Sequence, residues 1–466
     1  MRRMDVPDKH PNDRLARWIS VAGLNNTQLA SQIRTLAHQE GHPHVNPDSR
    51  RVRAWRQGER PRPPVPHLLV SVLRHHTGHP LTLDDIGMGS DAHVPLHERE
   101  WTHTVLAQEL TSLSRSDLVG ARFHEPSLQG SALLSALQPW VSLPERPATA
   151  RGTWRLGHTD IDRLHTLTEA LRSLDNLHGG GIARHAVLGQ VTRVSDLLAH
   201  ASYSEAVGQR LFTAVADLAG VAGWMSHDVG DHTAAQRYFL LALRAAKEAA
   251  NAPIGAHILN CMARQATHLD RPSDALELVH LALYGVRRSA TPTVRAVLHS
   301  LEARSHAIMG HTSEFERAAH QAEAALSATH TAVEEPTWAR FFDRAEHAAT
   351  IGVCHQILAR GSDPGHARRS VQMIEYAIDH RPAERHRSLA FDHIGLARAL
   401  LVQGETERAL AVTQQALNLL PDLSSTRVMD RLHDLSTEAA TMNDTYATNL
   451  HETLVRAQGA SQHDDL

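Results

Sequence analysis

Four arginines crowd into one short segment of the chain, at a spacing that suits the recognition of nucleic acid. Val52 and Trp55 lie three residues apart and mark the apolar edge of a helix predicted from 49 to about 57. Arginines at the same spacing occupy its outer face, and one more lies on its flank. They are Arg50, Arg53 and Arg56, with Arg51 beside them. A guanidinium presents a planar fork of donors that matches guanine edges and phosphate oxygens, so this face predicts contact with DNA.

Local signals predict where this basic helix begins and ends. Asp48 is a good N-cap, and Gly58 can adopt the left-handed conformation that stops a helix. A stiff connector follows, made by Pro61, Pro63, Pro64 and Pro66. The first surrounding helix is predicted at 15–22, ended by Gly23, and the second runs to about 37 with Asn26 or Thr27 as its cap. Another is predicted at 67–76, and Thr82 is expected to cap a short fifth helix.

The order of these signals resembles the five-helix DNA-binding domain of XRE-type (lambda-repressor-like) helix-turn-helix regulators. The matching residues are Thr27-Gln28-Leu29-Ala30, then Val52, Trp55 and Gly58, then Pro61. The run 56–66, RQGERPRPPVP, is similar to a subgroup from Streptomyces and other actinobacteria. The chain departs from the family in one respect, because the stretch from Gln28 to Asp48 is longer than a tight turn between the second and third helices needs.

The resemblance implies that the third helix enters the major groove of a double-stranded DNA operator and that the protein binds it as a homodimer. An arginine would read a guanine, while Gln28 and the other arginines would hold phosphates. The residues expected to contact DNA are Thr27, Gln28, Asn46, Ser49, Arg50, Arg51, Arg53 and Arg56. A solvated basic helix in a small bundle is the alternative reading of the same arginines.

Charge is distributed unevenly along the 466 residues. Residues 1–88 carry 13 Lys and Arg against 8 Asp and Glu, whereas the whole chain has a net charge of −4. An anionic polymer is therefore expected to bind the N-terminal part.

The second half of the chain repeats a pattern of a small residue, an apolar residue four positions later and a small or apolar residue three positions after that. The copies are Ala235/Phe239/Ala242, Ala275/Val279/Ala282, Phe315/Ala319/Ala322, Ser370/Ile374/Ala377 and Ala409/Thr413/Ala416. This resembles the tetratricopeptide repeat, with somewhat longer helices. The fold class expected is all-α, with a helix-turn-helix domain followed by an α-solenoid of helix pairs.

A solenoid of this kind has a concave groove lined by the first helix of each pair. The residues expected there are Asn260, Arg264, Arg295 and His299. An asparagine amide there suits the backbone of an extended peptide, so a peptide or small-molecule ligand is expected. Ordinary polar contacts between helices are the alternative for each of these residues.

Other functions find little support in the sequence. The 36 histidines include no His-Glu-x-x-His motif, so no metal or other cofactor is expected. Gly179-Gly180-Gly181 lacks the spacing of a phosphate-binding loop and predicts a turn between helices, and no catalytic motif suggests an enzyme. The chain has only two cysteines, Cys261 and Cys354, far apart in the sequence, which favours the reducing cytoplasm. No apolar run is long enough to span a membrane, so no membrane partner is expected.

These patterns predict three parts and leave two functions open. A DNA-binding domain is expected at 1–90, a helical connector at 91–160, and a sensor and dimerisation domain at 161–460. The first hypothesis is a DNA-binding transcriptional regulator whose repeats sense a ligand or a protein partner. The alternative is a protein-interaction scaffold that uses the repeat groove and has no specific affinity for DNA.

Overall fold

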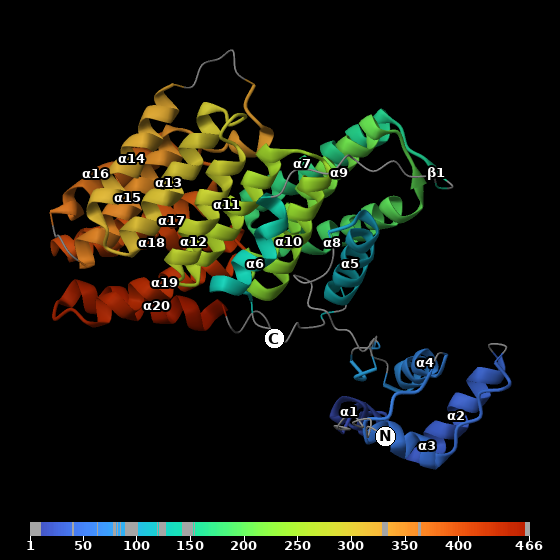
Figure 1. Cartoon of the computed structure of the whole chain (residues 1–466). Coiled ribbons are helices and arrows are strands. Elements are labelled where there is room, and N and C mark those ends of the chain that lie inside the picture. Colours follow the sequence, from blue (N-terminus) through green and yellow to red (C-terminus); the bar gives the residue numbers. More distant parts are fainter. Residues whose placement is uncertain are drawn as a thin grey trace, which may run out of the picture. The chain divides into compact units, whose positions relative to one another are not determined.

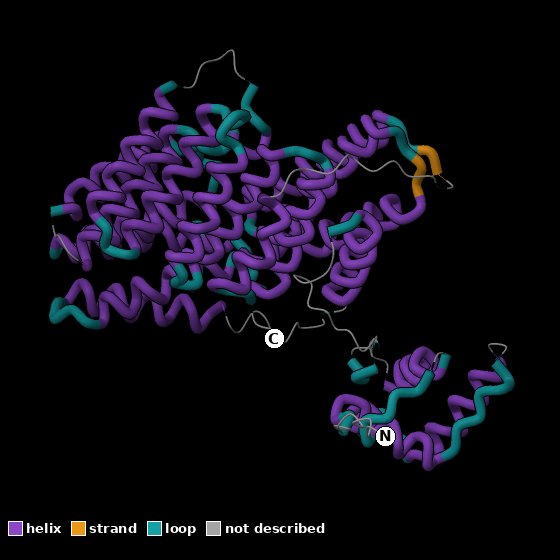
Figure 2. Tube along the Cα trace, in the orientation of Figure 1, coloured by secondary structure: helices purple, strands orange, loops and turns teal. Residues whose placement is uncertain are grey.

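The part of the chain that the structure describes is almost entirely helical, with one pair of very short parallel strands (Figures 1 and 2), so the all-α class is confirmed. The computed structural model describes residues 11–39, 42–62, 64–77, 81, 83, 85–88, 101–118, 120, 127–141, 152, 154–328, 334–361 and 365–461. The chain forms two compact units, Met1–Pro95 and Leu96–Leu466. Among the described helices, none combines the length and the apolar character that crossing a membrane requires.

The first unit has a small apolar core of its own. Its helices are α1 (Asp13–Val21), α2 (Asn26–Gln39), α3 (Ser49–Arg56) and α4 (Val65–Thr77). Helix α2 packs against α3 and α4, and α1 contacts the same two helices. Val52 and Trp55 of α3 are buried in this core together with Leu29 and Ile33 of α2. The predicted apolar edge of the basic helix is therefore confirmed.

Short-range signals set the ends of these helices. Asp48 Oδ1 accepts a hydrogen bond from Arg51 N at 2.8 Å, which confirms the predicted N-cap of α3. Gly58 has a φ of +95° and ends that helix, as expected. The predicted cap of α2 was wrong by one or two residues, because Asn25 Oδ1 accepts from the main-chain N–H groups of Thr27 and Gln28.

Thr82, the predicted cap of a short fifth helix after α4, lies outside the described residues, and of the described residues that follow it, 83 and 85–88, none is helical. Residues 85–87 form a turn. This turn is tied to the start of the unit, because Asn12 Nδ2 donates to the carbonyl oxygens of Ile86 and Gly87 at 3.0 and 3.2 Å.

The second unit begins with two helices from the segment expected to be a connector. They are α5 (His103–Leu118) and α6 (Gly130–Val141). Helix α5 packs against α8 (Gly180–His200) and α10 (His232–Glu248), and α6 packs against α10 and α12 (Pro272–Gly285), so both belong to the helical body. Lys247 Nζ holds the end of α6 by donating to Pro139 O at 2.7 Å.

The body itself is an array of antiparallel helices. In chain order it contains β1 (Trp154–Arg155), α7 (His158–His178), α8 (Gly180–His200), β2 (Ala201–Ser202), α9 (Glu205–Asp228), α10 (His232–Glu248), α11 (Ala252–His268), α12 (Pro272–Gly285), α13 (Pro292–Ile308), α14 (Thr312–Ser327), η2 (Thr337–Ala339), α15 (Arg344–Gly361), α16 (His366–His380), α17 (His386–Gln403), α18 (Thr406–Asn418), η3 (Leu420–Asp422), α19 (Thr426–Ala440) and α20 (Thr445–Ser461). Each odd-numbered helix from α9 to α19 packs against the helix that follows it, and neighbouring pairs stack on one another (Figure 1).

The repeated small and apolar residues lie where these helices meet. Ala235, Phe239 and Ala242 of α10 are fully buried, and so are their counterparts Ala275, Val279 and Ala282 of α12. Small residues opposite them allow close packing. At Gly223 of α9, for example, an added Cβ would lie 2.6 Å from the ring of Phe239.

The array closes on itself through contacts between α7–α9 and α17–α19, which we call the seam. Asp228, at the end of α9, is fully buried there and pairs with Arg387 and Arg427 at 3.1 and 2.7 Å. Arg387 also pairs with Asp175 of α7 at 2.9 Å.

The glycine triplet at the junction of α7 and α8 forms part of the seam. Gly179 makes the predicted turn, Gly180 and Gly181 begin α8, and at Gly181 an added Cβ would lie 2.1 Å from Ser424 Oγ. The main chain therefore passes closer to residue 424 than a side chain at this position would allow.

Candidate functional site

The first candidate site is the outer face of α3, which we call the basic face. Arg50, Arg51, Arg53 and Arg56 are all exposed on this helix, while Val52 and Trp55 anchor its other side in the core. The predicted division of α3 into an apolar and a basic side is therefore present in the structure.

The four arginines differ in their partners. Arg51 Nη1 lies 2.6 Å from Glu59 Oε1, and Arg56 Nη1 donates to Asn26 Oδ1 at 3.2 Å. Arg50 and Arg53 make no hydrogen bond or ion pair with any residue that the structure describes. These two guanidinium groups are available to an external anion or a base edge.

The other residues expected to contact DNA lie at the starts of α2 and α3. Gln28 and Thr27 are exposed in the first turn of α2, and Gln28 Oε1 accepts from Asn25 N at 2.9 Å. This bond orients the Gln28 side chain, as in a capping box. Asn46 is exposed before α3, and Ser49 is its half-buried first residue.

The second candidate site is a cavity of about 840 Å³ inside the second unit, which we call the central cavity. Its wall is built by the odd-numbered helices α7 to α19, with the segment around η2. The volume lies within the range of about 300–1,000 Å³ that is usual for small-molecule sites. The seam completes this wall, since Asp175, Arg387 and Arg427 are among the lining residues.

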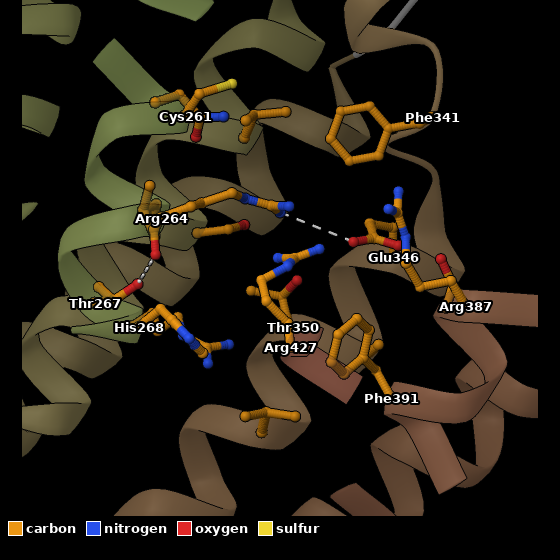
Figure 3. A pocket seen from close by; sticks show the side chains of 18 of the residues that line it. Cys261, Arg264, Thr267, His268, Phe341, Glu346, Thr350, Arg387, Phe391 and Arg427 are labelled. Atoms are coloured by element: carbon orange, nitrogen blue, oxygen red, sulfur yellow. Dashed lines mark hydrogen bonds and ion pairs between the residues drawn. The ribbon is translucent and has the colours of Figure 1, made fainter. Parts of the chain in front are cut away.

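Aromatic rings and cations alternate on the wall of the central cavity. Figure 3 shows Arg264 and Arg427 reaching into the space between Phe341 and Phe391. The Arg264 Cζ atom lies 5.7 Å from the centre of the Phe341 ring. Arg427 lies over the ring of Trp224 at 4.6 Å, a distance typical of a cation–π contact.

Two of the four residues expected in the groove line the central cavity, namely Asn260 and Arg264 of α11. The placement of the other two was wrong. Arg295 is exposed and does not line the cavity, and His299 Nδ1 lies 2.8 Å from Glu302 Oε2, also away from it. The face of α13 that borders the cavity instead carries Ser300 and Arg304. Repeat spacing identifies the lining helices but does not give the rotation of each helix about its axis.

The sequence interpretation missed several polar side chains of the central cavity. Arg304 and Gln356 line it, yet neither belongs to a motif or to the repeated pattern. Asp392 was also missed. Burial raises its pKa to about 7, although Arg381 Nε lies 2.5 Å from its carboxylate. Such residues become recognisable only once the helices that carry them are brought together.

Two neutral groups in the wall contribute shape and hydrogen-bonding capacity. His257 stacks on Trp338 with ring centroids 4.4 Å apart, and burial lowers its pKa to about 3. Burial raises the pKa of the nearby Cys261 thiol to about 12. At neutral pH both are uncharged. Within the described ranges, no group of three His, Cys, Asp or Glu side chains is arranged to hold a metal ion.

Comparison with known proteins bears on the first unit only. No curated protein and no solved structure matches the chain. Residues 15–89, which include the basic face and the core beneath it, match the family model described as the SP15 N-terminal domain.

Proposed function

We propose that this protein is a sequence-specific DNA-binding transcriptional regulator whose second unit binds a signal. In this proposal the first unit acts as a helix-turn-helix domain of the XRE type, and the second unit is a tetratricopeptide-like solenoid. The observation that carries the proposal is the pair Arg50 and Arg53, which are exposed and have no partner among the described residues, on a helix whose opposite side is buried in the core.

Docking of α3 in the major groove gives each residue of the basic face a role. Arg50 lies in the first turn of α3, where it can reach a base edge, and Arg53 lies one turn further along the same face. Arg51 and Arg56 are already oriented by Glu59 and Asn26 and would hold phosphates. Gln28 can present its amide NH₂ to a phosphate, because only its side-chain oxygen is used in the bond from Asn25 N.

The regulator would act in the cytoplasm as a homodimer, with two copies of α3 about 34 Å apart on successive turns of DNA. A signal bound in the second unit changes DNA affinity only if it binds one arrangement of the dimer more tightly than another. The central cavity is the place in the second unit best suited to that signal, which could be a small molecule or a peptide. The alternative signal is a protein partner that binds the outer surface of the array.

Selection of bound fragments from random and genomic DNA, followed by sequencing, tests this function. We expect the full-length protein to recover a palindromic motif. Arg50→Ala should lose preference at one position of each half-site, by about 1–3 kcal/mol for a bidentate contact with guanine. Arg17→Ala removes an exposed arginine from α1 and should leave the motif unchanged. Equal loss of preference in both variants would contradict the docking of α3.

Salt dependence separates this function from that of a protein-interaction scaffold. Phosphate contacts release counterions, so the affinity for DNA should fall steeply and log-linearly with salt concentration. A scaffold that recognises protein through the array would have no affinity for DNA even at low salt.

A further inference from the structure

The central cavity carries more positive than negative charge on its wall. Ten arginines line it against six carboxylates. Several of these arginines are neutralised within the structure. Arg387 pairs with Asp175 and Asp228, and Arg381 pairs with Glu346 and Asp392. Five more lining arginines pair with carboxylates in or behind the wall, namely Arg172, Arg385, Arg398, Arg427 and Arg431. The lining arginines without a closely paired carboxylate among the described residues are Arg264, Arg304 and Arg340.

Arg304 of α13 is the clearest case of a cation in the wall without a counter-ion. It makes no hydrogen bond or ion pair with any described residue, and its charged neighbours include Arg431, Arg264 and Arg398. Burial and the positive charge of these neighbours lower the pKa of Arg304 to about 10, so it remains a cation at neutral pH. Unbalanced charge of this kind is costly unless an anion accompanies it.

Arg264 of α11 adds to the same excess. The carboxylate of Glu346 lies 3.9 Å from its guanidinium, beyond hydrogen-bonding distance (Figure 3). That carboxylate is already engaged by Arg381 at 2.7 Å. Arg264 and Arg304 therefore border the cavity with most of their donors free.

Uncharged groups in the same wall also lack partners. The side chains of Asn260 and Gln356 are 2% and 1% exposed, and the structure gives Asn260 Oδ1 and Gln356 Nε2 no hydrogen-bond partner. A buried polar atom left without a partner destabilises the protein, because it has lost its bonds to water and gained none in exchange. Both residues line the cavity, so a ligand inside it can supply the missing bonds.

We propose that the central cavity is a binding site for a small organic anion, whose carboxylate or phosphate pairs with Arg304 and Arg264 and whose flat apolar body lies against Phe341 and Phe391. Asn260 and Gln356 would hydrogen-bond its polar substituents. The seam favours a small molecule over a long peptide or a folded partner, because Asp228, Arg387 and Arg427 join the two ends of the array around the cavity. This inference extends the sensing part of the proposed function.

Calorimetric titration of the full-length protein without DNA tests the site. The probes are phenyl phosphate and benzoate, which separate the two anionic groups, with benzyl alcohol as the neutral counterpart. We expect at least one anion to bind and the alcohol to bind at least about tenfold more weakly, as loss of a charge-assisted contact predicts. Failure of both anions to bind, or equal binding of the alcohol, overturns the proposal.

The variant Arg304→Met removes the charge while keeping most of the side-chain volume. It should weaken binding of the preferred anion by about 10- to 100-fold. Without ligand its thermal midpoint should be unchanged or higher, since an unpaired cation has been removed. Arg295→Met makes the same change on the exposed face of α13 and should bind as the wild type does.

Unchanged affinity in Arg304→Met overturns the proposal, and Arg264→Met provides a second test if the first variant does not fold. The result is independent of DNA binding. If the protein binds the anion but no DNA, the proposed site stands and the proposed regulatory function is wrong. If it binds DNA but no anion, only the proposed site is wrong.

Discussion

Replacement of Asp228 at the seam tests whether the array is closed as the structure has it. This carboxylate is fully buried at the end of α9. It accepts hydrogen bonds from Arg387 Nη1, Arg427 Nε and Gly180 N at 3.1, 2.7 and 2.9 Å. Ser425 Oγ donates a fourth bond at 3.0 Å. A single side chain thus connects α8, α9, α17 and α19.

Loss of this carboxylate leaves Arg427 without its buried counter-ion and Arg387 with Asp175 alone. Removal of one partner from a buried ion pair typically costs about 3–5 kcal/mol. We expect Asp228→Ala to lower the free energy of unfolding of the second unit by that amount. Asp228→Asn should cost less, because its amide oxygen can still accept from Gly180 N.

Chemical denaturation followed by circular dichroism measures the effect, and pH gives an independent check. Burial favours the neutral acid, but Arg387, Arg427 and the Gly180 N–H together hold the pKa of Asp228 well below its usual range. A carboxylate with a depressed folded-state pKa stabilises the protein above its unfolded pKa, which is about 4. The difference between wild type and Asp228→Asn should therefore be constant near neutrality and shrink as the pH falls below about 4.

Asp162→Asn serves as the matched control. Asp162 pairs with Arg210 at 2.6 Å, but both side chains are largely exposed, at 61% and 40%. An exposed pair contributes at most about 1 kcal/mol. If Asp228→Asn lowers the free energy of unfolding no more than Asp162→Asn does, the seam does not hold the array together and our description of a closed array is wrong.

Three further predictions concern other parts of the chain. Gly180→Ala should destabilise the protein by about 1–3 kcal/mol in the same denaturation assay, because the added Cβ would lie 2.7 Å from a main-chain oxygen of α9. Gly189→Ala, in the middle of α8 with open space around it, should be neutral or stabilising. Burial raises the pKa of Cys354, which is fully buried, to about 12, so this thiol should react with Ellman's reagent only as fast as the protein unfolds; its fast reaction in the native protein would contradict that burial. Gln28→Ala should weaken binding to every DNA sequence by a similar factor in a filter-binding titration, and a change restricted to the preferred motif would refute its phosphate role.

Much of the first unit was predictable because its signals act over a few residues. Asp48 caps α3 by accepting a hydrogen bond from a main-chain N–H three residues later, and Gly58 ends the helix because glycine readily adopts a positive φ. The cap of α2 is Asn25 rather than the predicted Asn26 or Thr27, because three consecutive residues can each cap a helix. The burial of Val52 and Trp55 followed from helical spacing alone.

In the second unit, spacing revealed the helix pairs but not their rotation. Asn260 and Arg264 border the central cavity, whereas Arg295 and His299 on the next lining helix do not. The rotation of α13 depends on how its neighbours pack, and Arg304 faces the cavity for that reason. No local pattern in the sequence distinguishes Arg304, which faces the cavity, from Arg295, which does not.

The sequence by itself determined the all-α class, the two ends of the basic helix of the first unit and the repeated contacts of the array, since each depends on residues close together along the chain. Only the tertiary structure decided how the array closes. The three glycines predict a turn from their local sequence, but the close approach of Gly179 and Gly181 to Ser424 and the pairing of Asp228 with Arg387 join segments more than 150 residues apart. Such contacts depend on the accumulated curvature of many stacked helices, which no short stretch of sequence specifies.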